Sequence, residues 1–236
     1  MLNTALIIPC FNEESRLAKE DFLKAADNYY LIFVNDGSKD NTLAHLNQFK
    51  HPNIAVVNLT KNVGKANAVR AGVLSLQKDQ RFKNLEWFGF LDSDLATPFS
   101  EINNFFLYRQ TFYPHAQSIW GSRIYKLGSK IDRKAKRHYT GRIFATMAHL
   151  ICGIETYDSQ CGAKIFHVNL IEKAFAAPFL SRWLFDIEIY LRLKSVEIVE
   201  YPLKTWRDIE GSKVSLIDML FKTIPELIRI RRHYRS

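Results

Sequence analysis

Four short apolar runs alternate with helical segments in the first half of this chain, and this alternation limits the possible folds more than any other feature. The apolar runs cover residues 4–9, 30–35, 54–59 and 87–91. Apolar residues recur at helical spacing in the segments that follow them, at about 13–26, 40–49, 64–77 and 98–110. Apolar strands that alternate with helices are typical of a parallel sheet buried on both faces. We therefore predict an α/β fold with a mostly parallel central sheet and helices on both faces.

A polar motif follows each of the four predicted strands. In chain order the motifs are Asn12-Glu13-Glu14, Asp36-Gly37-Ser38, Asn62-Val63-Gly64-Lys65 and Asp92-Ser93-Asp94. Ligands of open α/β sheets bind outside the carboxyl ends of the strands, so the four motifs together predict a binding site. Each motif by itself also suits an ordinary turn or helix cap.

Asp92 and Asp94 stand two residues apart, directly after the fourth apolar run. Two neighbouring carboxylates repel each other, and a divalent cation between them and an anionic ligand relieves that repulsion. Oxygen ligands suit Mg²⁺ or Mn²⁺, either of which stabilises a diphosphate as a leaving group. We therefore expect a metal site that bridges to a diphosphate.

The motifs in their order resemble the signature of family 2 glycosyltransferases with the GT-A fold. That resemblance rests on Pro9-Cys10-Phe11-Asn12-Glu13-Glu14, on Val34-Asn35-Asp36-Gly37-Ser38 with Asp40 and Thr42, on Asn62-x-Gly64-Lys65 and on Asp92-x-Asp94. Downstream motifs resemble the dolichyl-phosphate β-glucosyltransferase branch, which lies beside the polyprenyl-phosphate mannose and glucose synthases. They are Gly121-Ser122-Arg123, Asp158-Ser159-Gln160-Cys161-Gly162-x-Lys164-x-Phe166, Arg182-Trp183-x-Phe185-Asp186-x-Glu188 and Trp206-x-x-Ile209-Glu210-Gly211-Ser212-Lys213.

The resemblance implies a nucleotide-sugar donor, with UDP-glucose favoured. Glu13 and Asp36 would contact the nucleoside, and Asp36 would read the base. The remaining nucleotide-binding residues that the resemblance implies are Pro9, Lys65, Asp92, Arg207 and Lys213. Arg207 and Lys213 align with a loop that closes over the diphosphate, and Gly211 between them would permit its motion.

The resemblance also assigns the metal. Asp94 would ligate Mg²⁺ or Mn²⁺, and Asp92 would touch the ribose or the waters of the ion. In the mannose synthases a polar residue two positions after the second Asp adds a metal contact, whereas this chain has Ala96 there. Metal binding is therefore expected to rest on Asp94, the diphosphate and water.

On the acceptor side, the segment 123–142 carries eight basic residues and the single acid Asp132. The resemblance places Arg123 and a second basic residue, Arg137, at the phosphate of a polyprenyl phosphate. The planar fork of arginine matches phosphate oxygens in a bidentate fashion, which gives a physical reason for that choice. The alternative is a solvated basic surface.

The acceptor determines how much base catalysis is needed. A lipid phosphate is largely dianionic at neutral pH, since its second pKa is about 6, and it needs positioning and charge neutralisation. A hydroxyl acceptor would need a general base, for which Asp158 and Asp186 are candidates, with Glu188 behind them. Both aspartates could instead be structural, capping a loop or holding Arg182. We expect an inverting transfer to the lipid phosphate, with Arg123, Asp158 and Asp186 as catalytic residues.

The last segment, 216–236, is expected to form an amphipathic helix with a basic tail, beside a catalytic domain of residues 1–215. Its apolar residues recur at helical spacing: Ile217, Leu220, Phe221, Ile224, Leu227 and Ile228. Such a helix suits a membrane interface, although packing against the domain is the alternative. With no run of about 18 apolar residues, no signal peptide and three unpaired cysteines, we expect a cytoplasmic protein, with peripheral contact at the cytoplasmic face of a membrane.

Three other functions fit parts of the pattern. A family 2 enzyme with a hydroxyl acceptor, in glycan or cell-surface polysaccharide synthesis, would depend on Asp158 or Asp186 more than on Arg123. A sugar-phosphate nucleotidyltransferase would carry a glycine-rich, arginine-bearing loop after the first strand, where this chain reads Cys10-Phe11-Asn12-Glu13-Glu14. A basic RNA-binding module fits the net charge of +9, but we expect no nucleic-acid partner.

Overall fold

The structure, a computed structural model, describes residues 3–208 and 216–235, with only the backbone described for 216–222. The chain forms two compact units. The first unit comprises residues 1–95 and 162–183, and the second comprises residues 96–161 and 184–236. Lys213 and Gly211, which were assigned to a closing loop, lie outside the described residues.

The described residues of the first unit include five neighbouring sheet strands in the order β3-β2-β1-β4-β7. Its strands are β1 (Thr4–Cys10), β2 (Tyr30–Asp36), β3 (Ile54–Leu59), β4 (Trp87–Leu91) and β7 (Ala163–His167). The first four are parallel, in register pairs such as Pro9 with Val34, and β7 runs antiparallel to β4. The four strands expected from the apolar runs are confirmed, with ends within one residue of the prediction.

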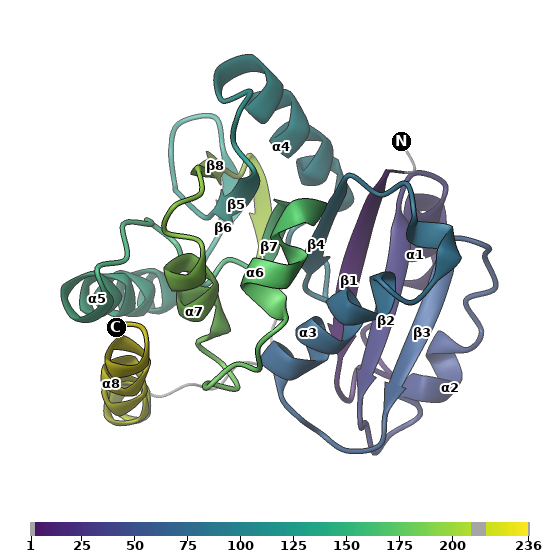
Figure 1. The fold of residues 1–236 in the computed structure, drawn as a ribbon, viewed down its shortest axis with the longest axis horizontal. Helices are drawn as coiled ribbons and strands as arrows, with labels where there is room; N and C mark the ends of the chain where they lie inside the picture. The colour runs from purple at the N-terminus through teal and green to yellow at the C-terminus, as the bar shows by residue number, and fades with distance from the viewer. Residues whose placement is uncertain (1–2, 209–215, 236) are drawn as a thin grey trace. The chain divides into compact units, whose positions relative to one another are not determined.

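Helices cover both faces of this sheet, as predicted. Its helical segments are α1 (Lys19–Ala26), α2 (Thr42–Leu46), α3 (Lys65–Leu76), α6 (Ile171–Phe175) and the short 3-10 turns η1 (Gln80–Phe82) and η2 (Val168–Leu170). Figure 1 shows α3 on the face opposite to α1 and α2. This follows from right-handed crossovers, because the chain reverses direction across the sheet after β3. The strand order therefore has a switch point between β1 and β4, where ligands of such sheets bind.

One predicted boundary is wrong. A helix was expected from residue 13, but α1 begins at Lys19. The backbone N–H groups of Glu13 and Glu14 donate to the side chains of Thr42 and Asp40 in another loop, so this stretch is held away from helical geometry.

Close packing holds α3 against the strands of the first unit. Gly72 lies in the middle of α3, and a Cβ added there would stand 2.6 Å from Ile7 Cγ2 and 2.9 Å from Val34 Cγ2. Ile7 and Val34 are fully buried, and each buried side chain of this kind contributes about 1.5–3 kcal/mol. A larger residue at position 72 would push the helix off the sheet.

In its described residues, the second unit has two pairs of parallel strands and four helices. The pairs are β5 (Ser118–Ser122) with β8 (Ile198–Pro202), and β6 (Lys130–Asp132) with β9 (Thr205–Arg207). The helices are α4 (Phe99–Phe112), α5 (Ala135–Cys152), α7 (Phe185–Arg192) and α8 (Leu216–His233). The segment α4 was predicted at 98–110, and the strand β5 at 118–121.

The C-terminal helix α8 packs on α5 within the second unit. Leu227 and Ile230 are fully buried, and the Cys152 thiol at the end of α5 lies 3.4 Å from the Leu227 carbonyl oxygen. Ile224 and Ile228, from the predicted apolar stripe, remain exposed. Among the described side chains of α8, packing on α5 therefore buries some of the apolar residues and leaves others exposed.

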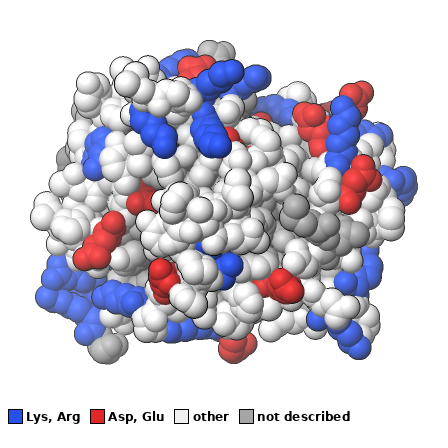
Figure 2. Space-filling model, turned by 90° about the horizontal axis from the view of Figure 1, so that it is seen from above, with Lys and Arg blue, Asp and Glu red and all other residues white. Residues whose placement is uncertain are grey.

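Charge is divided unevenly. Lys and Arg number 14 against 12 Asp and Glu in the first unit, and 19 against 12 in the second. On the face drawn in Figure 2, Lys and Arg side chains gather at the lower left, with few acids beside them. Within the described residues, no helix is both long enough and apolar enough to span a membrane.

Candidate active site

Side-chain hydrogen bonds tie the loop after β1 to the loop after β2. Thr42 Oγ1 accepts from Glu13 N–H (2.7 Å), and Asp40 Oδ2 accepts from Glu14 N–H (3.2 Å). Asn12, in the left-handed region at φ 55°, donates its N–H to Ser38 Oγ at 3.0 Å. A non-glycine residue with positive φ is uncommon and persists where surrounding contacts hold it. The motif residues thus set the loop that carries Glu13.

Asp36 fastens the end of β2 to the loop before α3. Its carboxylate accepts from Val63 N–H (2.7 Å) and Gly64 N–H (3.0 Å), and it is buried. Burial raises the pKa of Asp36, while the two backbone hydrogen bonds and Arg182 act in the opposite direction. Asp36, expected to read the base, therefore also organises this loop.

Lys65 and Asp92 form an ion pair, with Lys65 Nζ 2.5 Å from Asp92 Oδ1. Gly162 lies against the same carboxylate, because a Cβ added there would stand 1.9 Å from Asp92 Oδ2. Lys65 therefore offsets the charge of one of the two aspartates expected at the metal. Sequence reasoning did not single out Gly162 as a site residue, although its place in the motif after Asp158 was the available signal.

Glu13, Ser93 and Asp94 come together at the switch point between β1 and β4. Burial raises the pKa of Glu13, Arg16 and Ser93 lower it, and the nearby Asp94 carboxylate raises it again. Arg16 Nε stands 2.8 Å from Glu13 Oε2. Leu95 closes the turn at φ 52°, with its N–H 3.2 Å from Asp92 O. The first unit thus presents carboxylates from two adjacent strands where a ligand is expected.

The donor atoms here fit a hard divalent cation. They are carboxylate oxygens, which Mg²⁺ and Mn²⁺ prefer. Among the described residues no group of three or more His, Cys, Asp or Glu is placed to enclose a metal. Ala96, the position where the mannose synthases have a polar residue that contacts the metal, is an apolar and buried residue here. An ion held at Asp94 would complete its coordination with oxygens of a ligand and water.

In the second unit, Arg123 and Asp158 form a bidentate pair. Arg123 Nε and Nη2 donate to the two oxygens of Asp158 at 2.6 and 2.7 Å, and Arg123 N–H donates at 3.1 Å. Burial would raise the pKa of Asp158, but Arg123 and Arg133 outweigh it and hold that pKa well below its usual range. Asp158 is therefore a weak base in this arrangement and positions Arg123.

Two further contacts hold this pair in place. Glu200 on β8 accepts from Tyr157 N–H (2.7 Å) and Asp158 N–H (2.9 Å), and so fixes the Asp158 loop. Trp206, which is buried, lies with its ring 5.4 Å from the Arg123 guanidinium carbon. The sequence analysis did not single out Glu200. An acidic residue within the otherwise mostly apolar strand β8 was the available signal.

Arg133 and Arg137 lie in the same unit. Arg137 pairs with Asp208 through its guanidinium and a carboxylate oxygen. Arg133 Nη2 donates to Arg137 O at 3.3 Å and sits over Gly141, where a Cβ would stand 2.5 Å away. Burial and the charge of Arg123 lower the pKa of Arg133. Among the described residues, no carboxylate lies within ion-pair distance of Arg133. In the sequence, the only sign of a role for Arg133 was its place in the basic segment 123–142.

The remaining predicted residues are spread through the second unit. Asp186 is buried at the start of α7, with Gln160 Nε2 3.4 Å from its Oδ2. Glu188 accepts from the Tyr234 hydroxyl at 3.0 Å, which ties α7 to the region after α8. Arg207 is exposed on β9, where its backbone N–H donates to Ala96 O. Glu188 therefore acts in packing.

Comparison with known proteins is consistent across sequence and fold. A family model for glycosyl transferase family 2 matches residues 5–175. A dolichyl-phosphate beta-glucosyltransferase of Trichomonas vaginalis is 31% identical over 99% of this chain and 72% of its own length. The enzymes of the same name from Saccharomyces cerevisiae and Homo sapiens are 28% and 27% identical, over 98% of this chain and 74% and 75% of their own.

Among solved structures, glucosyl-3-phosphoglycerate synthase from Mycobacterium tuberculosis superposes with a TM-score of 0.65 at 15% identity, covering 99% of this chain and 80% of that one. That level of identity bears on the fold alone. The family match spans most of this chain and includes the strand-end motifs described above. The chain is therefore a member of glycosyl transferase family 2, with the GT-A fold.

Proposed function

We propose that this enzyme transfers glucose from UDP-glucose to a dolichyl or other polyprenyl phosphate, with inversion at the anomeric carbon. The observation that carries the proposal is the group of three arginines in the second unit, Arg123, Arg133 and Arg137. It occurs in a chain whose relatives over nearly its whole length are named for a dolichyl-phosphate acceptor and a β-linked glucose. A β-linked product from an α-linked donor requires one displacement with inversion.

The first unit supplies the donor side of the proposal. Asp94 would hold Mg²⁺ or Mn²⁺, and Glu13 and Asp36 would contact the nucleoside, with Pro9 and Lys65 nearby. The bound ion would neutralise charge on the departing diphosphate. Crystal structures of the mycobacterial synthase contain Mn²⁺ or Mg²⁺ with UDP, which supports this arrangement in the same fold.

The second unit supplies the acceptor side. A phosphate monoester with a second pKa of about 6 is already a nucleophile at neutral pH, so the enzyme needs to neutralise and orient it. Arg123 is oriented by Asp158, and Arg133 is a half-buried guanidinium that makes no ion pair with a described carboxylate, although the charge of Asp158 acts on it. We assign Arg123 and Arg133 to the acceptor phosphate. Arg137 contributes with less of its charge, since Asp208 pairs with it.

The lowered pKa of Asp158 favours a phosphate acceptor over a hydroxyl acceptor. A general base for a hydroxyl needs a pKa near the working pH, and the pKa of Asp158 is held far below it. Asp186 would be the base if the acceptor were a hydroxyl. A membrane-embedded lipid phosphate also implies that the enzyme works at a membrane surface, on the cytoplasmic face where nucleotide-sugars are made.

The test is a transfer assay with Mn²⁺, a short polyprenyl phosphate and a panel of nucleotide-sugars. UDP release that requires both UDP-glucose and the lipid phosphate is the expected result. Transfer to a glycan hydroxyl, with no response to the lipid phosphate, would overturn the proposal.

Two variants test the proposed donor site and the proposed acceptor site separately. Asp94→Asn should lower turnover about a hundredfold or more, since it removes the proposed metal ligand, whereas the exposed Asp21→Asn should not. Arg133→Gln should raise the KM for the lipid phosphate about ten- to a hundredfold, the value of a charge-assisted hydrogen bond, without changing the KM for UDP-glucose. The matched control is Lys136→Gln, an exposed cation in the same segment.

A further inference from the structure

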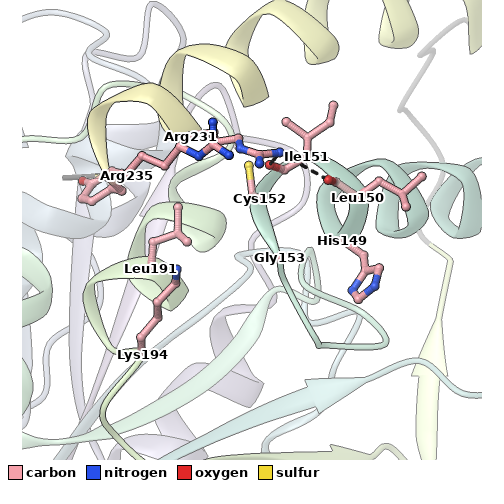
Figure 3. Close-up of a pocket in the computed structure, with 10 residues that line it drawn as sticks. His149, Leu150, Ile151, Cys152, Gly153, Leu191, Lys194, Arg231 and Arg235 are labelled. Atoms are coloured by element: carbon pink, nitrogen blue, oxygen red, sulfur yellow. Dashed lines mark hydrogen bonds between the residues drawn. The ribbon is translucent and has the colours of Figure 1, made fainter.

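A pocket of about 240 Å³ lies in the second unit beside the end of α5 and the last turns of α8 (Figure 3). Its lining residues are His149, Leu150, Ile151, Cys152, Gly153, Leu191, Lys194, Arg231, Tyr234 and Arg235. Three of these, Lys194, Arg231 and Arg235, have basic side chains, and none of those described as lining the pocket is Asp or Glu. The pocket is therefore positively charged.

Among the described residues, no Asp or Glu carboxylate pairs with these cations. Within the part of the chain that the structure describes, none of the three lies within 4.0 Å of an Asp or Glu oxygen. Arg231 Nη1 donates to Ile151 O at 2.6 Å, a backbone oxygen at the end of α5, as Figure 3 shows. The neighbouring acid Glu188 is fully buried, accepts from the Tyr234 hydroxyl and stands 3.8 Å from Arg192. An anion in the pocket would therefore meet Lys194 and Arg235, whereas Arg231 already donates to backbone oxygens at the end of α5.

Exposed apolar side chains lie on α5 and α8, the two helices whose ends line the pocket. Leu150, which lines it, has 70% of its surface exposed, and Figure 3 shows its side chain directed away from Arg235. On α5, Tyr139 and Ile143 are also exposed and stand eleven and seven residues before Leu150, so the three share one helix face. On α8, Ile224 and Ile228 are exposed one turn apart. Cations beside exposed aliphatic side chains are typical of helices that lie in a membrane interface.

We propose that this pocket binds the phosphate group of an anionic phospholipid and so holds the α5–α8 surface against the membrane. Lys194 and Arg235 would contact the phosphate, and Leu150 would enter the interface. This inference rests on the proposed function in one respect, namely that the acceptor is a membrane lipid. The site is separate from the arginines assigned to the acceptor phosphate.

The test measures vesicle binding by flotation, with phosphatidylcholine alone or mixed with phosphatidylserine. The full chain should bind the mixed vesicles and not the neutral ones. Lys194→Gln/Arg235→Gln should weaken binding about thirtyfold, or about fivefold for each cation removed. The control Lys24→Gln/Lys50→Gln removes the same charge from exposed positions of the first unit and should weaken binding less than threefold, roughly the residual long-range effect of charge.

Equal loss of binding in the two double variants would overturn the proposal, because it would mean that overall charge alone drives attachment. Leu150→Ser should also weaken binding, and an unchanged affinity would exclude insertion at that residue. Thermal unfolding of every variant establishes that the loss is not due to unfolding.

Two further measurements distinguish the lipid from other outcomes. If inorganic phosphate raises the Tm of the wild type and not that of Lys194→Gln/Arg235→Gln, while vesicles do not bind, the pocket serves a soluble phosphate and the lipid proposal is wrong. Transfer to a detergent-dispersed short polyprenyl phosphate should be unchanged in the pocket variant. Absence of that transfer in the wild type would contradict the proposed function and leave the vesicle result standing.

Discussion

In the first unit, backbone amides or a lysine hold the carboxylates of the candidate site. In the second unit, carboxylates hold the arginines of the candidate site. Asp36 is fixed by two backbone N–H groups and Asp92 by Lys65. Arg123 is fixed by Asp158 and Arg137 by Asp208. The basic excess is correspondingly small in the first unit and large in the second.

This difference follows from the ligands that the two units are proposed to bind. A metal with a diphosphate needs oxygen donors, whereas a phosphate needs guanidinium or ammonium groups. The supporting charges differ in burial as well. The Arg123–Asp158 pair has side chains 15% and 8% exposed, whereas those of Lys65 and Asp92 are 36% and 40% exposed. Removing a partner should therefore be far more costly in the second unit.

The largest difference between the two units is expected when one partner is removed from the ion pair of each. Asp158→Asn leaves the Arg123 guanidinium buried without its counter-charge and should lower the free energy of unfolding by about 3–5 kcal/mol. Lys65→Met, at the exposed pair, should lower it by about 0–1 kcal/mol. Urea unfolding monitored by circular dichroism measures both.

A third variant separates stability from activity in the same comparison. Arg123→Met/Asp158→Leu replaces the pair by apolar side chains and should recover most of the lost stability without recovering transfer. Equal stability losses for Asp158→Asn and Lys65→Met would refute the distinction between the two units.

Acid should act differently on the two units. The folded pKa of Asp158 lies below its unfolded value of about 3.9, so its stabilisation is complete above about pH 5 and is lost as the pH falls through and below 3.9. Glu13 and Asp36 have raised pKa values, so their protonation as the pH falls favours the folded state. The urea midpoint of the wild type should therefore fall more steeply between pH 5 and pH 3 than that of Arg123→Met/Asp158→Leu. Parallel curves would show that Asp158 does not control acid stability.

The smallest expected difference in stability between the two units is at two glycines with positive φ. Gly37 in the first unit and Gly128 in the second both have positive φ, at 63° and 84°. Alanine carries the left-handed conformational cost of about 1–2 kcal/mol at either position. At Gly37 the added Cβ would also stand 2.4 Å from the Lys61 carbonyl carbon, whereas at Gly128 nothing lies within 4 Å.

Gly37→Ala should therefore lower the free energy of unfolding by at least about 1 kcal/mol more than Gly128→Ala. Differences in Tm between the two variants measure this. A larger loss at Gly128 would mean that the loop after β2 packs less closely on Lys61 than the contact at Gly37 indicates.

Much of the fold was predictable because its determinants are local. The four apolar runs became β1 to β4, since short continuous apolar runs between helical segments are typical of strands buried under helices. The family motifs were equally readable, because each consists of neighbouring residues at a strand end. The start of α1 was not predictable, because the groups that displace it, Asp40 and Thr42, come from a different loop.

The sequence singled out several residues of the candidate site, but not how their charges pair. Arg123 and Asp158 were both singled out, yet their bidentate contact joins positions 35 residues apart, and it changes Asp158 from a candidate base into a positioning residue. Arg133 was one of eight basic residues in its segment, and nothing in the order of those residues separated it from Arg137. The ion pair between Arg137 and Asp208 separates them.

The sequence by itself determined the strands, the donor motifs and the basic character of the acceptor segment, because hydrophobic period and residue chemistry are properties of the chain. Only the tertiary structure decided which charges neutralise one another: Lys65 with Asp92, Arg123 with Asp158, Arg137 with Asp208. It also left Lys194, Arg231 and Arg235 around one pocket without an acid among its described lining residues. Electrostatic roles depend on distance and burial, and folding sets both between residues that are far apart along the chain.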